Sequence, residues 1–176
     1  MSDDPNDFLF RQTAERALSA KEQAKRDEVA ARAILDSLFK EQRDLVEDPD
    51  NRKSLVTPRR AGKTFCAISY AIWVCLTFPN TRVPIITLTL RSAKRLYWDP
   101  IDELNRQYSL NIEKKTTDNA VIFPNGSKLF LNGAETRKDI EKLRGGSYKL
   151  VLIDECKSFD IYIFQELVDD ILRAAT

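Results

Sequence analysis

The sequence predicts an α/β fold in which helices flank a parallel β-sheet. The apolar runs 83–90 and 149–155 have the length and the β-branched residues of strands buried on both faces. Before the first of them, the segment 64–78 is apolar on nearly every side and is followed by Pro79, as expected of a helix packed on a sheet. Strands that alternate with helices in this way indicate parallel pairing.

The N-terminal quarter of the chain predicts helix. Residues 12–44 are rich in Ala, Glu, Lys and Arg and carry only sparse apolar anchors, which indicates a broken helix with a narrow apolar stripe. The anchors are Leu18, Val29, Ile34, Leu38 and Leu45. We therefore expect a helical arm or lid at 1–45 and a core domain at 46–176.

Turn signals and apolar runs predict the remaining elements of the core domain. A turn at 48–51 ends the arm, and a hairpin has its turn at Asn125-Gly126. The predicted elements are, in order, a first strand at 53–57, a helix at 92–108, the hairpin at 120–132 and a short helix at 136–143.

Composition fits one domain and excludes several kinds of catalysis. The 176 residues, 43% of them hydrophobic, are enough for one substantial core. No segment has the length of a membrane span and the N-terminus lacks signal-peptide character, so we expect a cytoplasmic protein without a membrane partner. The three cysteines have no metal-ligand spacing and predict free thiols. Because the chain has no histidine, a serine triad, a zinc protease motif and a histidine-dependent nuclease are excluded.

The charge is unevenly distributed although the net charge is only +1. Residues 1–50 hold 13 Asp and Glu against 8 Lys and Arg, whereas the remainder of the chain is basic. This excess of positive charge on the core is compatible with binding a polyanion, but solvated surface residues produce the same pattern.

The segment 57–64 predicts a phosphate-binding loop. It follows a short apolar run, opens the apolar helix, and reads Thr57, Pro58, Arg59, Arg60, Ala61, Gly62, Lys63, Thr64. Gly62 would allow close approach of phosphate, Lys63 would reach the β and γ phosphates, and Thr64 would offer its hydroxyl to Mg²⁺. The loop departs from the usual pattern because Thr57 replaces the first glycine. Taken alone, the segment is equally a basic turn before a helix.

A second motif supports the nucleotide interpretation. The apolar run 149–155 ends in Asp154 and Glu155, and two carboxylates at a buried strand end are costly unless they serve a cation or a reaction. In a phosphate-loop enzyme, Asp154 would hold Mg²⁺ and Glu155 would be the general base that activates water. The two motifs in this order predict a P-loop NTPase of the RecA/ASCE-like kind that uses ATP and Mg²⁺.

From about 39 to 159 the chain resembles the ATPase domain of the large terminase subunit, the DNA-packaging motor of tailed bacteriophages. The resemblance rests on the segment 39–45 around Gln42, the glycine-poor loop with Arg59, the hairpin at 123–127, the segment Leu143-Arg144-Gly145 and the segment 152–156. It implies that Gln42 reads the adenine edge and that Arg144 is an arginine finger for a neighbouring subunit in a ring.

Each implied role has a structural alternative. Gln42 alone reads as a surface helix residue, Arg59 and Arg60 as residues that balance phosphate charge in cis, and Arg144 as a helix-end arginine that caps carbonyls. The resemblance also implies double-stranded DNA, the small terminase subunit and the portal as partners. The family's coupling motif and nuclease domain would lie beyond Thr176, so we expect no DNA cleavage and weak turnover from this chain.

Two other functions remain open from the sequence. A helicase-like, DNA-translocating ATPase would share the upstream glutamine, although the arginine-bearing loop and the hairpin fit terminases better. A non-catalytic assembly module would use the acidic helical arm to dock a partner.

Overall fold

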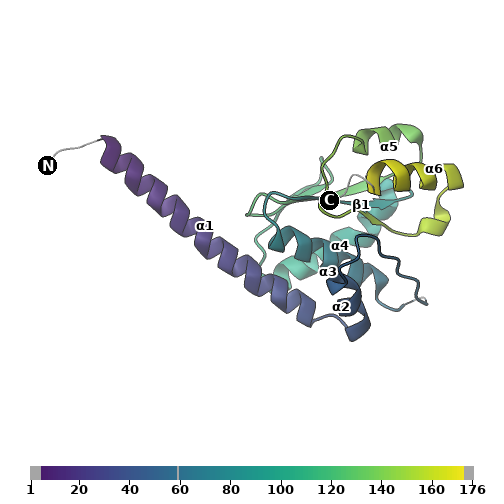
Figure 1. The fold of residues 1–176 in the computed structure, drawn as a ribbon, viewed down its shortest axis with the longest axis horizontal. Helices are drawn as coiled ribbons and strands as arrows, with labels where there is room; N and C mark the ends of the chain where they lie inside the picture. The colour runs from purple at the N-terminus through teal and green to yellow at the C-terminus, as the bar shows by residue number, and fades with distance from the viewer. Residues whose placement is uncertain (1–4, 59, 173–176) are drawn as a thin grey trace.

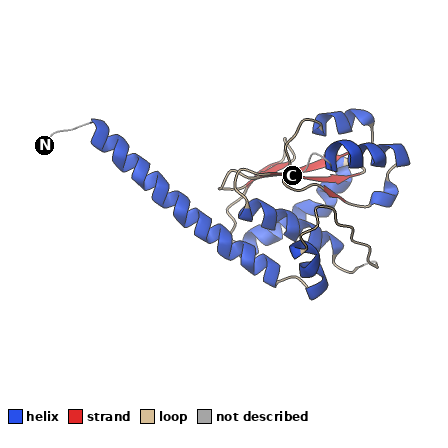
Figure 2. Ribbon diagram, in the orientation of Figure 1, coloured by secondary structure: helices blue, strands red, loops and turns tan. Residues whose placement is uncertain are grey.

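The fold is a five-stranded mixed sheet covered by helices on both faces (Figures 1 and 2). The structure, a computed structural model, describes residues 5–58 and 60–172. The strand order is β2-β3-β4-β1-β5, with strands β1 Arg82–Thr87, β2 Glu113–Lys115, β3 Ala120–Ile122, β4 Lys128–Gly133 and β5 Leu152–Ile153. The helices are α1 Pro5–Asp36, α2 Lys40–Glu47, α3 Lys63–Thr77, α4 Leu90–Tyr108, α5 Arg137–Leu143 and α6 Ile161–Glu166, with a 3₁₀ turn at Cys156–Ser158 and a π-helical segment at Leu167–Ile171.

Strand β1 lies between β4 and β5 and runs parallel to both. Its side chains alternate between two hydrophobic cores, as predicted for a strand buried on both faces. Val83 and Ile85 belong to the core formed with α3 and α4, whereas Ile86 belongs to the core formed with α5 and the C-terminal helices. The carboxyl ends of the three parallel strands therefore lie at one edge of the sheet.

Helix α1 is a long arm that packs on the body only through its C-terminal part, and its N-terminal part extends away from the sheet (Figure 1). The helical region is broken at 37–39, as predicted. The buried face carries Asp27, Ala31 and Ile34, spaced four and three residues apart. Val29, expected to be an anchor, is 64% exposed because its place two residues after Asp27 turns it to the opposite face. That expectation was wrong.

The expected first strand at 53–57 does not form, since residues 52–58 have no assigned strand or helix. A strand needs a neighbour for its backbone N–H and C=O groups, and residues 52–58 pair with none of the five strands of the sheet. Leu55 and Val56 are accordingly exposed, Val56 by 92%. The prediction of a strand there was wrong, whereas those of helices at α3, α4 and α5 are confirmed.

The predicted hairpin forms between β3 and β4, and its turn anchors the C-terminal end of α3. Asn125 Nδ2 donates to the carbonyl oxygens of Cys75 (2.9 Å) and Leu76 (3.4 Å), while Asn125 Oδ1 accepts from Ser127 N (3.0 Å). The Ser127 hydroxyl donates to Phe78 O at 2.9 Å. These bonds satisfy carbonyl groups that a helix end leaves without partners. The hairpin motif therefore has a structural role at the end of α3 remote from the loop.

We predict that Asn125→Ala lowers the free energy of unfolding by about 1–3 kcal/mol, because it leaves buried carbonyls at the α3 end unsatisfied. Urea unfolding followed by circular dichroism measures this difference. Asn51→Ala, at an exposed turn residue, is the matched control and should change the stability by less than about 0.5 kcal/mol. Equal stabilities for the two variants would show that the turn does not anchor α3.

Candidate nucleotide site

The loop before α3 has the backbone geometry of an anion-binding turn. Arg60 and Gly62 have positive φ angles of 65° and 74°, and Gly62 is the N-cap of α3, with no side chain capping that end. The first N–H groups of α3 therefore remain available to a ligand, and the helix dipole adds positive potential there. The left-handed backbone favours glycine at position 62, and a Cβ atom there would lie 2.9 Å from Gln42 Nε2, so the Gln42 amide would have to move.

Lys63 folds over its own loop. Its Nζ donates to the carbonyl oxygens of Thr57 and Pro58, each at 3.1 Å. Thr64, in the first turn of α3, is half-buried, whereas Pro58, Arg60 and Ala61 are exposed. Arg59, the arginine favoured by the resemblance, lies outside the described residues. The arrangement places one ammonium group beside the open N-terminus of a helix, which suits a polyphosphate.

Gln42 lies against this loop rather than on the surface. Its side chain is buried, and Nε2 donates to the carbonyl oxygens of Ala61 (3.5 Å) and Gly62 (3.4 Å). Its Oε1 accepts from Phe39 N at 3.3 Å, at the start of α2. The structure thus joins Gln42 to the loop 19 and 20 residues away in sequence.

The acidic pair follows β5 at the carboxyl edge of the sheet. The Asp154 N–H donates to Ile86 O of β1 at 2.9 Å, which fixes the backbone beside the central strand. Asp154 Oδ1 accepts from Glu155 N at 2.8 Å. Glu155 is exposed and has a left-handed backbone with φ 54°, a conformation that costs a non-glycine residue energy and is frequent at functional sites.

Tyr97 of α4 is a member of this site that the sequence did not reveal. Its hydroxyl donates to Asp154 Oδ2 at 2.7 Å, and its side chain is fully buried. Burial, with the nearby Asp154 and Glu155 carboxylates adding to it, raises the pKa of Tyr97, so the phenol remains a proton donor. Only its place on the buried face of an amphipathic helix marks this tyrosine in the sequence, and that does not identify its partner.

Arg144 ends α5 and makes ion pairs with carboxylates of the C-terminal helices. Its Nε and NH2 donate to Asp170 Oδ2 at 3.0 and 2.6 Å, and NH2 lies 3.9 Å from Glu166 Oε2. The hydrogen bond to Asp170 raises the pKa of the guanidinium, which keeps its charge. The side chain is 46% exposed, so it remains accessible at the surface.

The residues of the candidate site thus form three groups. Gln42 joins the loop, Tyr97 joins the acidic pair, and Arg144 joins the C-terminal helices. Among the described residues, no hydrogen bond or ion pair connects the loop with Asp154 or Glu155. In that same part of the chain, no group of three or more His, Cys, Asp or Glu side chains is placed to hold a metal.

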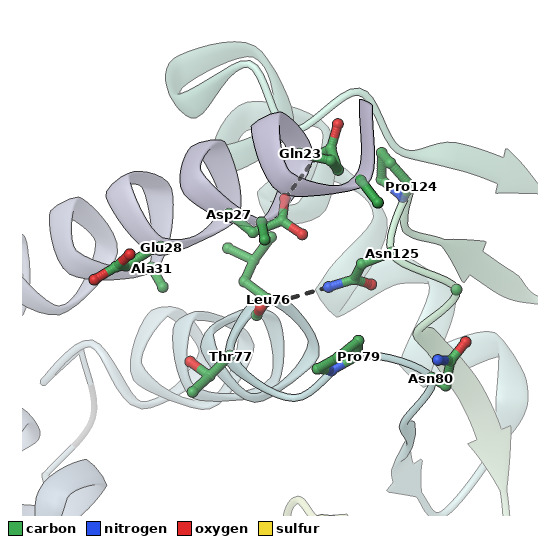
Figure 3. Close-up of a pocket in the computed structure, with 13 residues that line it drawn as sticks. Gln23, Asp27, Glu28, Ala31, Leu76, Thr77, Pro79, Asn80, Pro124 and Asn125 are labelled. Carbon is green, nitrogen blue, oxygen red and sulfur yellow. Dashed lines mark hydrogen bonds between the residues drawn. The ribbon is translucent and has the colours of Figure 1, made fainter. Parts of the chain in front are cut away.

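A large cavity of about 780 Å³ lies elsewhere, between α1, the end of α3 and the hairpin turn (Figure 3). Asp27 and Glu28 line it, and the described lining residues include no Lys or Arg. Asp27 is buried and accepts from Gln23 Nε2 at 2.7 Å, and burial raises the pKa of its carboxyl group. Without a cationic side chain on its walls, this cavity is unsuited to a triphosphate. The candidate site is therefore the loop and the acidic pair.

No curated protein matches the sequence. Among solved structures, the large terminase of a thermophilic bacteriophage is 18% identical with a TM-score of 0.59, and the match covers 74% of this chain and 35% of that one. The large terminase ATPase domain of Thermus phage P74-26 is 14% identical with a TM-score of 0.63, and the match covers 80% of this chain and 61% of that one. The first of these two terminases has also been solved in complex with ADP. That structure is 17% identical with a TM-score of 0.59, and the match covers 75% of this chain and 35% of that one.

These likenesses show a shared fold and confirm the predicted fold class. The chain spans only about a third to three fifths of the length of those structures. Residues 54–169 match a family profile described as "Terminase large subunit, T4likevirus-type, N-terminal". Because this match extends over well over half of the sequence and contains both the loop and the acidic pair, the chain belongs to the terminase large subunit family, to its N-terminal domain of the T4-like-virus type.

Proposed function

We propose that this chain binds ATP with Mg²⁺ and hydrolyses it as a module of a motor that packages double-stranded viral DNA. The observation that carries the proposal is Lys63, whose ammonium group lies over a loop that opens directly into the uncapped N-terminus of α3. Family membership, and the complexes of the thermophilic-phage large terminase with ADP and ATP-γ-S, support the same ligand class.

Lys63 would exchange its two carbonyl partners for oxygens of the β and γ phosphates. Both existing bonds are 3.1 Å long and go to neutral oxygens, whereas a phosphate offers charged acceptors that bind an ammonium more strongly. The N–H groups at the start of α3 would hold the same phosphates. Arg59 and Arg60 would add positive charge in the loop, in cis or toward a neighbouring subunit.

The residues present fit a magnesium ion. Mg²⁺ prefers oxygen ligands and usually takes one or two protein groups together with waters and phosphate oxygens. The Thr64 hydroxyl and the Asp154 carboxylate are such groups, and the described hydrogen-bond partners of Asp154 include no cationic side chain. When bound, Mg²⁺ would neutralise charge on the phosphates. Thr64 and Asp154 would hold the ion in place.

Glu155 would position the attacking water and accept its proton. Its exposed carboxylate is adjacent to Asp154, and the left-handed backbone turns the chain sharply at this position. Gln42 would read the adenine edge. Its bonds to the loop carbonyls, at 3.4 and 3.5 Å, are near the limit of hydrogen bonding, so the amide can turn toward a base at little cost.

Arg144 would act as an arginine finger in the site of a neighbouring subunit. For this it must leave Asp170 and Glu166. The pair with Asp170 is partly exposed on both sides, and pairs of that kind contribute little to stability because water solvates both partners. The ring that brings two subunits together would contain further copies of this chain, with double-stranded DNA as the translocated substrate.

The arm 1–45 would dock a partner, such as the small terminase subunit or the portal, while 46–176 forms the ATPase core. The observation that favours an assembly role is the extension of α1 beyond the sheet (Figure 1). An ATPase assay with and without DNA separates the two functions. A chain that hydrolyses no ATP and still binds a partner through 1–45 would be an assembly module.

We predict that Lys63→Ala abolishes or nearly abolishes ATP binding, because the ammonium group is the principal positive charge at the phosphates. Fluorescence titration with a labelled ATP analogue measures this. Lys138→Ala removes one equal charge from an exposed position of α5 and should bind ATP as the wild type does. ATP affinity that survives Lys63→Ala would refute the site.

Glu155→Gln should keep ATP binding and lower turnover about 10²–10⁴-fold, because it removes the general base and leaves the phosphate contacts. The measurement is steady-state phosphate release beside the same binding titration. A variant that loses binding and turnover together would show that Glu155 holds the nucleotide instead.

For Arg144 we predict complementation between subunits. Arg144→Ala and Glu155→Gln chains are each inactive, and mixing them should restore part of the ATPase rate, because each supplies the group the other lacks. The rate is measured at concentrations where light scattering shows assembly. Assembled mixtures without recovered activity would eliminate the role of Arg144 in trans.

A further inference from the structure

We propose that Tyr97 is a positioning residue for the metal site, and that its hydroxyl orients the Asp154 carboxylate so that the carboxylate can hold Mg²⁺. This inference rests on the proposed function, since it concerns the ion that accompanies ATP. It adds a residue from α4, an element that contributes no sequence motif to the site.

The Tyr97 ring is held rigidly. It is completely buried within the core formed by α3, α4, β1 and β4, where Ala93 and Ile101 of α4 are buried as well. Its hydroxyl reaches Asp154 Oδ2 at 2.7 Å, across 57 residues of sequence. A donor fixed by a packed ring removes rotational freedom from its acceptor.

Asp154 is held at three points. Its N–H is bonded to Ile86 O, Oδ1 accepts from Glu155 N, and Oδ2 accepts from Tyr97. The first bond ties the backbone of Asp154 to β1, and the second lies between adjacent residues, so neither joins the carboxylate group to another element. Within residues 5–58 and 60–172, Tyr97 is the partner that ties the carboxylate group to a separate element, so it fixes the direction in which the free lone pairs point.

The chemistry of the donor matters for a cation site. A phenol hydroxyl is neutral, so it orients the carboxylate without cancelling its charge, whereas a Lys or Arg partner would compete with the metal for it. Groups that hydrogen-bond to metal ligands in this way commonly change metal affinity about 10–100-fold when removed. The alternative is that Asp154 only satisfies the buried Tyr97 hydroxyl, which would affect stability alone.

The test compares Tyr97→Phe with wild type and with Tyr148→Phe. Tyr148 is also buried and donates to a backbone oxygen, Leu143 O at 2.9 Å, so its variant loses a similar bond without involving Asp154. A labelled ATP analogue is titrated with Mg²⁺ and again with EDTA. Mn²⁺ binding measured by electron paramagnetic resonance gives a readout independent of activity.

In Tyr97→Phe, we expect the affinity in EDTA to be unchanged and the gain produced by Mg²⁺ to fall about tenfold. Tyr148→Phe should keep the full gain. In an Asp154→Asn background, Tyr97→Phe should cause no further loss, because the two residues act as one unit. If Mg²⁺ raises the affinity for the ATP analogue as much in Tyr97→Phe as in the wild type, this inference is overturned and the proposed function stays intact.

Absence of any Mg²⁺-dependent gain in the wild type would overturn the proposed metal site together with this inference. Should Tyr97→Phe fail to fold, wild-type protein with ¹³Cζ-labelled tyrosine follows the same hydroxyl by nuclear magnetic resonance. Addition of Mg²⁺ to the ATP-bound protein should then shift the Tyr97 signal and leave that of Tyr148 in place. A Tyr97 signal that does not move would overturn the inference.

Discussion

The structure depends on the parallel pairing of β1 with β4 on one side and β5 on the other. Strand β1 is apolar from Val83 to Ile86 and buried on both faces there, and helices on each side cover it. This pairing brings the carboxyl ends of three strands to one edge, which is where α/β sheets bind ligands. Asp154 lies at that edge because its N–H is bonded to Ile86 of the central strand.

The two halves of the candidate site are supported by different elements. Gln42 from α2 supports the loop at Gly62, whereas Tyr97 from α4 supports the acidic pair at Asp154. Each half is thus held by a residue from a helix that carries none of the proposed phosphate or metal ligands. No described hydrogen bond joins the halves. In the proposed function Mg·ATP would connect them, through Lys63 and Thr64 on one side and Asp154 on the other.

Periodicity and turn chemistry sufficed to predict much of the fold. The apolar segment at α3, the buried run at β1 and the Asn125-Gly126 turn each determine their structure locally. The strand expected at 53–57 failed because pairing depends on a neighbour, which local sequence does not specify. The contacts of Tyr97 with Asp154 and of Arg144 with Asp170 span 57 and 26 residues and arise only from packing. Motifs indicated the phosphate loop and the acids, but not the residues that orient them.

Hydrogen–deuterium exchange with and without Mg²⁺ and ATP-γ-S tests the central claim that the loop and the acidic pair form one nucleotide site. The account predicts that the ligand protects amides at 60–66 and at 153–156 together, while the hairpin turn at 123–127 is unchanged. Protection of the loop alone would contradict a joint site. Protection confined to the cavity between α1 and the hairpin would place the nucleotide elsewhere and contradict the account entirely.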